Sequence, residues 1–202
     1  MFQYGFELEA FYHDGLGIAV PPKTWPTDGY PGLVEFRTTG FADLDQAYFN
    51  LLKEINKYDI NFISLVSSHT FTKVQNKILR SRHSIKQAWD ITNLYNKPPR
   101  NLGNKTIASF QINISNLIKI GYTDENKIRH PDIFGLLDIP RIVRNLDKEF
   151  ENQIKESGRQ LGEYCIKGNR LEYRSLPNLV ACFDMSDIKI LLNKIKKAVE
   201  QN

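Results

Sequence analysis

The stretch G-N-R-L-E-Y-R-S-L-P-N, residues 168–178, decides the fold predicted for this chain. Successive side chains of an extended strand point to opposite faces, so Glu172 and Arg174 share one face and Leu171 and Tyr173 the other. An antiparallel strand with one solvated and one buried side shows this alternation. The stretch therefore predicts a strand with a charged face and an apolar face.

Three further stretches repeat this arrangement, and their polar faces also consist of charged or amide side chains. They are G-F-E-L-E-A-F from Gly5, L-V-E-F-R-T from Leu33 and S-F-Q-I-N-I-S from Ser109. Their polar positions are Glu7, Glu9, Glu35, Arg37, Gln111 and Asn113, and their apolar positions are Phe6, Leu8, Val34, Phe36, Phe110, Ile112 and Ile114. If the four strands share one sheet, its polar face gathers four carboxylates, two guanidiniums and two amides.

Length and composition predict one globular domain over residues 1–202. The chain has 202 residues, of which 41% are hydrophobic and 25% charged, as in an ordinary soluble protein. It has no apolar run of membrane-spanning length, and its first residues lack the features of a secretory signal, so we expect a cytoplasmic protein. Two cysteines, Cys165 and Cys182, are expected to be reduced thiols.

The remaining periodicity predicts an α+β fold in which helices cross the apolar side of the sheet. Apolar residues recur at helical spacing in three segments, and shorter apolar runs predict further strands. The expected helices span Phe41–Tyr58, Ile139–Ser157 and Met185–Val199, and the further strands span Asn61–Val66, Ile107–Ser115 and Leu161–Lys167. Gly168-Asn169 predicts a tight hairpin turn before an Arg170–Leu176 strand, and Asn116–Pro140 is expected to be irregular.

Several carboxylates on one face are unfavourable unless cations neutralise them. Mg²⁺ prefers oxygen ligands, and neighbouring arginines grip phosphate oxygens, so the pattern suits ATP-dependent phosphoryl transfer. The alternative is a wet sheet face on which Glu35 and Arg37, or Glu172 and Arg174, form ordinary ion pairs. The pattern alone leaves both interpretations open.

The order of these motifs resembles that of the phage-type carboxylate-amine ligases, or amidoligases, of the glutamine synthetase and glutamate-cysteine ligase-like superfamily. The resemblance begins with G-F-E-L-E-A-F-Y, continues through Asp28-Gly29 and Glu35-Phe36, and reaches I-V-R-N-L-D at Ile142. It ends with Arg159, Gly162-Glu163 and the run E-Y-R-S-L-P-N at Glu172. At Gln111 and Asn113 the chain is similar to plant-type glutamate-cysteine ligases, whereas most of the superfamily has two histidines there.

The resemblance implies a curved antiparallel sheet whose charged face binds Mg²⁺ and ATP, with helices on the other face. ATP would phosphorylate a small-molecule or peptide carboxylate, and an amine would attack the acyl phosphate to form an amide. By the same resemblance the metal ligands would be Glu7, Glu9, Glu35, Gln111 and Glu172. Catalysis would depend on Arg174, Arg37 and Glu172, with Arg174 clamping the transferred phosphoryl group, and ATP phosphates would contact Arg37, Arg159 and Arg174.

Two functions of other classes compete with the ligase. The first is a catalytically inactive protein that keeps the fold as a binding or inhibitory module. The second is a nucleic-acid-binding protein that would use basic residues in two segments. These are Lys73, Lys77, Arg80, Arg82, His83 and Lys86, and the C-terminal Lys189, Lys194, Lys196 and Lys197. The first of these segments also fits a solvated helix face, and neither interleaves its charges with aromatic residues for base stacking.

Overall fold

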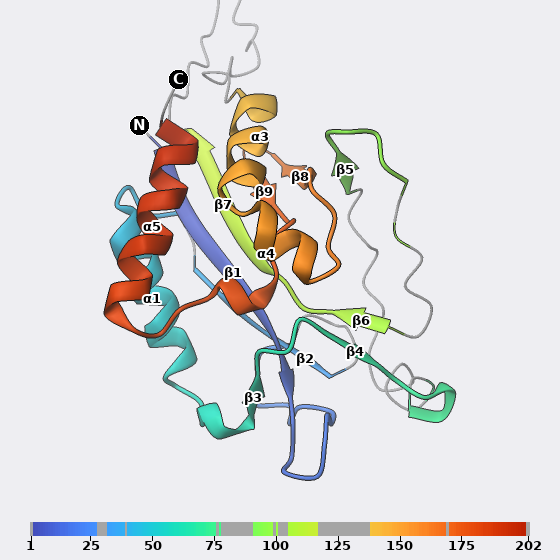
Figure 1. Ribbon diagram of the computed structural model, residues 1–202. Coiled ribbons are helices and arrows are strands. Elements are labelled where there is room, and N and C mark those ends of the chain that lie inside the picture. Colours follow the sequence, from blue (N-terminus) through green and yellow to red (C-terminus); the bar gives the residue numbers. More distant parts are fainter. Residues whose placement is uncertain are drawn as a thin grey trace, which may run out of the picture.

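A computed structural model gives the fold of the chain (Figure 1). The structure describes residues 2–27, 32–38, 40–75, 77, 91–98, 100, 105–116, 138–168 and 170–200. Asp28-Gly29, most of the Lys73–Lys86 segment and most of the Asn116–Pro140 segment lie outside these residues. Within them, no helix is long and apolar enough to cross a membrane.

The centre of the fold is an antiparallel sheet, which confirms the predicted α+β class (Figure 1). Its strands are ordered β2-β1-β7-β9-β8-β5, and β3 pairs with the far end of β1. Their bounds are Phe2–Tyr12 (β1), Leu33–Arg37 (β2), Ile63–Ser64 (β3), Thr92–Asn93 (β5), Phe110–Asn116 (β7), Glu163–Lys167 (β8) and Arg170–Tyr173 (β9). A separate pair consists of β4 (Ser68–Thr70) and β6 (Lys105–Ile107).

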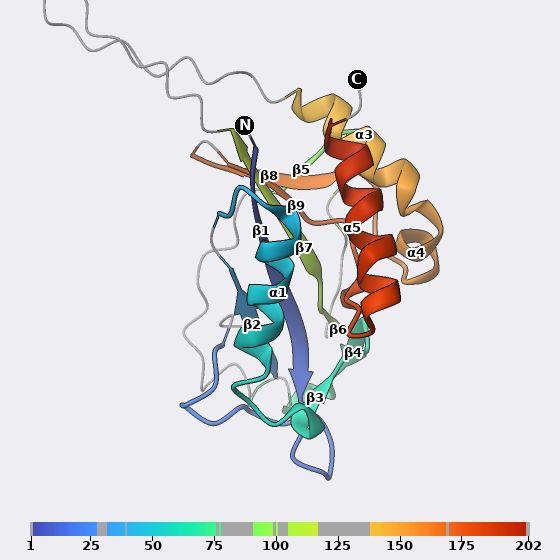
Figure 2. The same cartoon turned by 90° about the vertical axis from the view of Figure 1, so that its left-hand side faces the viewer.

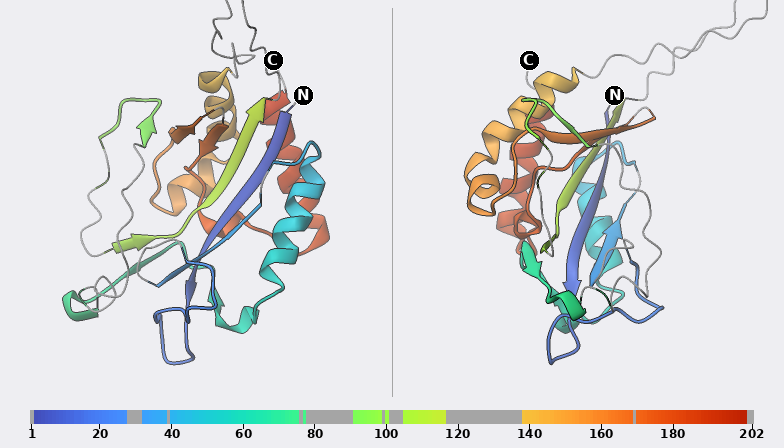
Figure 3. Two further views of the ribbon diagram at one scale, coloured as in Figure 1. Left: turned by 180° about the vertical axis from the view of Figure 1, so that it is seen from behind. Right: turned by 90° about the vertical axis from the view of Figure 1, so that its right-hand side faces the viewer.

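The helices gather on one side of this sheet, as the edge views show (Figures 2 and 3). They are α1 (Leu44–Ile55), α3 (Ile139–Glu149), α4 (Glu151–Glu156) and α5 (Met185–Glu200), with short 3-10 helices at Ile60–Phe62 and Asn178–Val180. Side-chain caps stabilise the starts of α1 and α5: Asp43 accepts from the Gln46 amide at 2.7 Å, and Asp184 from the Ser186 amide at 2.8 Å. The helices therefore cover the face that the apolar strand positions line.

The main core lies between the sheet and these helices. Phe6 and Phe110 stack with ring centroids 5.4 Å apart, and Tyr48 of α1 meets Phe6 edge-on at 5.3 Å. All three side chains are fully buried. Burial of such aromatic side chains contributes a large part of the hydrophobic stabilisation and fixes which face of β1 points inward.

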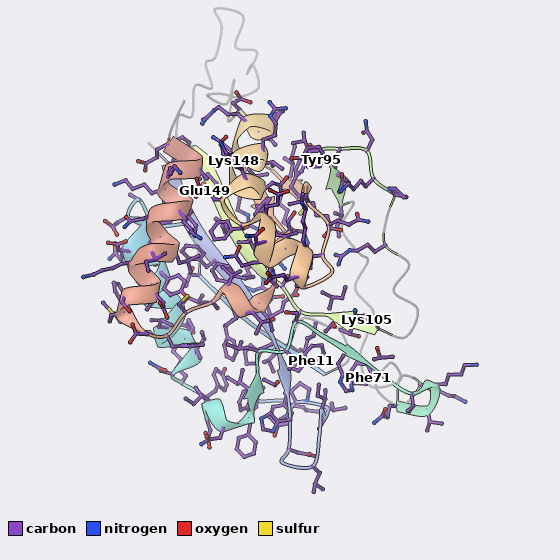
Figure 4. The ribbon with its side chains drawn as sticks, in the orientation of Figure 1. Phe11, Phe71, Tyr95, Lys105, Lys148 and Glu149 are labelled. Carbon is purple, nitrogen blue, oxygen red and sulfur yellow. The ribbon has the colours of Figure 1, made fainter. Side chains whose placement is uncertain are left out.

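A smaller apolar cluster closes the other side of the sheet at the end of β1. Phe11 packs with Leu33, Ala108 and Phe71, and the Phe11 and Phe71 rings lie 6.5 Å apart (Figure 4). In the strand alternation Phe11 follows Glu7 and Glu9, so this cluster forms an apolar floor at one end of their face.

Three predicted elements are interrupted, and each break coincides with a specific contact. The Ile139–Ser157 helix divides at Phe150, whose backbone leaves the helical region (φ −121°, ψ 17°) while its ring enters the core. The Ile107–Ser115 strand breaks at Ala108, whose amide donates to Ser67. The Asn61–Val66 strand begins as a 3-10 helix, because the Asp59 side chain accepts from the Asn61 amide at 3.0 Å.

The predicted Arg170–Leu176 strand is also shorter than expected. β9 ends at Tyr173, and the Arg174 amide then donates to the Glu163 carbonyl at 2.8 Å. Leu176 is nevertheless fully buried in the core. The predicted apolar face therefore continues to Leu176, although β9 itself ends at Tyr173.

Candidate functional site: the polar face of the sheet

The strand register brings the predicted polar residues onto one face. Glu7 lies opposite both Arg37 and Gln111, Glu9 lies opposite Glu35, and Asn113 lies between Gly5 and Glu172. Directly opposed residues of neighbouring strands project from the same side of a sheet. We call this side the polar face; it comprises Glu7, Glu9, Glu35, Arg37, Gln111, Asn113, Glu172 and Arg174.

Glu9 is held by a set of hydrogen bonds at the centre of the polar face. Its Oε2 accepts from the amide and the hydroxyl of Ser109, both at 2.7 Å, and its Oε1 accepts from Gln111 Nε2 at 2.9 Å. The Arg174 guanidinium approaches Oε1 at 3.9 Å. Burial nevertheless raises the pKa of Glu9, although Arg174 and Ser109 lower it.

Glu7 has fewer partners. Its Oε1 accepts one hydrogen bond, from Asn113 Nδ2 at 3.1 Å. Burial raises the pKa of Glu7 above its ordinary value, and repulsion from Glu172 and Glu35 raises it further, while Lys167 and Arg37 act in the opposite direction. The ionised form of Glu7 is therefore less favourable in this position than in water.

Glu172 lies in the opposite environment. Lys167 and Arg174 form ion pairs with its two carboxylate oxygens, and Arg170 approaches Oε2 at 3.7 Å. The Cys165 thiol donates to Oε1 at 3.2 Å. Although burial opposes the shift, Lys167 and Arg174 lower the pKa of Glu172 below its ordinary value. Burial and the neighbouring Glu172 raise the pKa of Cys165 to about 11, so this thiol is a poor nucleophile.

Arg174 links the two environments, because it contacts both Glu172 and Glu9. Although burial opposes the shift, these two carboxylates raise its pKa. Arg37 lies at the rim, where it pairs with the buried Glu35 while 59% of its own side chain is exposed. Of the two predicted catalytic arginines, Arg174 lies within the polar face and Arg37 at its border.

Arg159 lies beneath this region and contacts backbone. Its guanidinium donates to the carbonyls of Ser175 at 3.0 Å, Ala108 at 3.1 Å and Arg174 at 2.5 Å. Burial and repulsion from Arg100 lower its pKa to about 10. These contacts hold the backbone that carries Arg174, so Arg159 has a positioning role in the structure. Its contact with phosphate stays a prediction.

The amide side chains leave oxygen atoms without partners. The side-chain amide of Gln111 donates to Glu9, and that of Asn113 donates to Glu7. Among the described residues, Gln111 Oε1 and Asn113 Oδ1 are buried and accept no hydrogen bond. Buried acceptors without partners are uncommon and need an explanation. A ligand that presents a cation or a donor would satisfy them.

The oxygen donors fit Mg²⁺ in their chemistry. Glu7, Glu9 and Glu35 supply carboxylates beside the two unpartnered amide oxygens. Among the described residues no three His, Cys, Asp or Glu side chains are grouped closely enough to hold a metal ion. Mg²⁺ is usually bound by one or two carboxylates together with water and substrate phosphates, so such a group is not required.

Four further residues contact glutamates of the polar face, although the sequence pattern did not predict them as site residues: Lys167, Arg170, Cys165 and Ser109. Lys167 and Arg170 lie directly opposite each other across the β8–β9 hairpin, and Cys165 lies opposite Glu172. The predicted two-residue turn implies the first of these pairs. Ser109 shares the alternation of Gln111 and Asn113, and the β1–β7 pairing continues to it, because the Glu9 amide donates to the Ser109 carbonyl at 2.9 Å.

One cavity of about 380 Å³ lies away from the polar face, between α4 and the 3-10 helix at Asn178–Val180. Its lining includes Ser67, Gln153 and Glu156. None of its lining residues belongs to the polar face, so we do not connect it with the predicted site.

No family model, curated protein sequence or solved structure matches the chain.

Proposed function

We propose that this protein is an ATP- and Mg²⁺-dependent carboxylate-amine ligase with its active site on the polar face. The observation that carries the proposal is the register that gathers Glu7, Glu9, Glu35, Gln111 and Arg174 on one side of the sheet. The proposal also depends on the motif order that resembles the amidoligases. The glutamine synthetase-like architecture is part of this proposal.

The acidic part of the polar face is the proposed Mg²⁺ site. Glu7 and Glu9 are buried, and this burial is the main cause of their raised pKa values; a bound divalent cation would stabilise both carboxylates. The unpartnered oxygen of Gln111 supplies a further ligand of the type that Mg²⁺ accepts. When bound, the metal would neutralise charge on the phosphate groups.

Arg174 is the proposed clamp for the transferred phosphoryl group. Its guanidinium is held between Glu9 and Glu172, and Arg159 fixes its backbone, so its position is determined before any ligand binds. A pre-positioned guanidinium stabilises developing charge without reorganisation. In the proposed reaction a substrate carboxylate attacks the terminal phosphate of ATP, ADP leaves, and an amine then displaces phosphate from the acyl phosphate. The products are an amide, ADP and phosphate.

Glu172 has a modified role in this proposal. The role of metal ligand predicted for it stays a prediction, but both of its oxygens contact cations in this structure. We therefore propose that Glu172 also orients Arg174 and Lys167.

The second candidate is a catalytically inactive binding module. The observation that favours it is the ion pairing of Glu172 with Lys167 and Arg174, because a face that already pairs its charges can persist without metal. The nucleic-acid alternative has less support. Lys197 pairs with Glu149 and Lys194 lies 5.5 Å from the Phe150 ring, so these two lysines pack on the helix side.

Thermal unfolding with ATP, with Mg²⁺ and with both tests the ligase proposal against the binding module. The ligase predicts a joint stabilisation larger than the two separate ones, and a ligand at one hundred times its Kd adds about 2.7 kcal/mol. A positive result leads to a screen of acids and amines for ADP release. Unchanged unfolding temperatures under all three conditions would contradict the ligase and favour the binding module.

A further inference from the structure

Three cations converge on one carboxylate at the β8–β9 end of the polar face. Lys167, Arg170 and Arg174 all lie within 4.0 Å of Glu172, from the last residue of β8, the first of β9 and the residue after β9. We call these three residues the cationic trio. Arg174 also lies 3.9 Å from Glu9, so two carboxylates face these three cations.

The neighbouring part of the polar face has the opposite balance. Glu7, Glu9 and Glu35 are three carboxylates, and Arg37 at the rim is paired with Glu35. Arg174 approaches Glu9 at 3.9 Å and thus lies at the border between the two parts. The face is therefore divided into an acidic part on β1 and β2 and a basic part on β8 and β9.

The trio is held in place and remains accessible. The Lys167 and Arg174 side chains are 17% and 18% exposed, and that of Arg170 is 34% exposed. Lys167 and Arg170 are directly opposed across a two-residue turn, so the hairpin fixes their separation. Three cationic side chains that converge at a partly exposed position are well placed to bind an anion through charge-assisted hydrogen bonds.

We propose that the cationic trio is an oxyanion-binding subsite, with Lys167 and Arg170 as binding residues in addition to Arg174. Guanidinium and ammonium groups recognise phosphate and carboxylate through charge-assisted hydrogen bonds. The identification of the anion rests on the proposed function, in which it is either the phosphate chain of ATP or the carboxylate of the acid substrate. An anion bound here lies beside the acidic part of the face, where the metal is proposed to bind.

Calorimetric titration without metal or nucleotide tests this subsite. The probes are inorganic tripolyphosphate and succinate at constant ionic strength, and the variants are Lys167→Gln and Arg170→Gln. Lys197→Gln is the matched control, because Lys197 also pairs with a glutamate, Glu149, but lies on the helix side. Arg170→Gln is the safer variant for folding, since Arg170 is the most exposed of the trio.

We expect the wild type and Lys197→Gln to bind at least one probe equally, and Lys167→Gln and Arg170→Gln to bind it at least about fivefold more weakly. Tighter binding of tripolyphosphate identifies the phosphate chain as the source, and tighter binding of succinate identifies the substrate carboxylate. No binding of either probe by the wild type, or equal binding by folded Arg170→Gln, would overturn the proposal. If a probe binds but ATP and Mg²⁺ give no joint stabilisation, the subsite stands and the ligase proposal fails.

Discussion

Glu9 and Glu172 belong to the same face of the same sheet and are both almost fully buried, yet their pKa values shift in opposite directions. Burial raises the pKa of both carboxylates. At Glu172 the nearby Lys167 and Arg174 outweigh burial, whereas at Glu9 the more distant Arg174 and the Ser109 hydrogen bonds do not. The comparison shows that the number and distance of cations, more than depth, decide which carboxylates of this face are well compensated.

The largest effect is expected for Glu172→Gln, which removes the carboxylate around which the cationic trio converges. Breaking a buried ion pair by removing one partner typically costs about 3–5 kcal/mol, because the remaining charges are left uncompensated. Urea denaturation should show a loss of this size in the free energy of unfolding. Inorganic phosphate should restore part of the loss if the trio binds oxyanions.

The control for this variant is Glu149→Gln, which breaks the surface pair with Lys197. Surface pairs contribute about 0–1 kcal/mol, so this loss should be clearly smaller. Equal losses in the two variants would mean that the trio does not depend on Glu172, and the contrast within the polar face would be wrong.

Glu7→Gln should have a smaller effect of opposite sign. The raised pKa of Glu7 means that its charge opposes folding at neutral pH, and glutamine keeps an acceptor for Asn113 Nδ2. We expect the free energy of unfolding to rise by about 1 kcal/mol. The control is Glu54→Gln on α1, whose carboxylate pairs with the exposed Lys57 and whose loss should change stability by less than about 1 kcal/mol. A destabilised Glu7→Gln would show that Glu7 is better compensated than its environment indicates.

The pH dependence should separate the two glutamates further. The folded-state pKa of Glu7 is above its ordinary value of 4.5, so its unfavourable contribution is complete above the folded pKa and disappears as the pH falls to 4.5. The folded-state pKa of Glu172 is lower than 4.5, so its favourable contribution is lost only below 4.5, as the pH falls through the folded pKa. Denaturation at several pH values should therefore show the Glu7→Gln difference vanishing first. The reverse order would contradict the assignment.

The smallest effect is expected for Arg37→Gln at the rim. With 59% of its side chain exposed, Arg37 is screened by solvent, so loss of its pair with Glu35 should cost about 0–1 kcal/mol. Urea denaturation in low and high salt measures this, and any loss should shrink in salt. A loss as large as that of Glu172→Gln would show that the acidic part of the face depends on Arg37 for its stability.

Much of the fold follows from local patterns. Two-residue alternation predicts both faces of β1, β2, β7 and β9, and helical spacing predicts α1 and α5 to within three residues at each end. The break at Phe150 is not predicted, because the ring fits the helical spacing and only its packing in the core disturbs the backbone. Local periodicity contains no information about such tertiary contacts.

The site could be predicted only in part for a related reason. Alternation along one strand groups Glu7 with Glu9 and Glu172 with Arg174, but Lys167, the other cation paired with Glu172, comes from a different strand. Lys167 and Arg170 are opposed because of hairpin register, Ser109 lies across from Glu9 in the β1–β7 register, and Arg174 approaches Glu9 from the chain after β9. Register and strand ends are set by the whole sheet, so these contacts require the structure.

Calorimetric titration of ATP with Mg²⁺ into the wild type, Glu7→Gln and Glu54→Gln tests whether the polar face is a metal-nucleotide site. We expect the wild type and Glu54→Gln to bind with equal affinity, and Glu7→Gln, which lacks one proposed metal ligand, to bind at least about tenfold more weakly. No binding to the wild type, or binding that Glu7→Gln leaves unchanged, would contradict a metal-nucleotide site on this face.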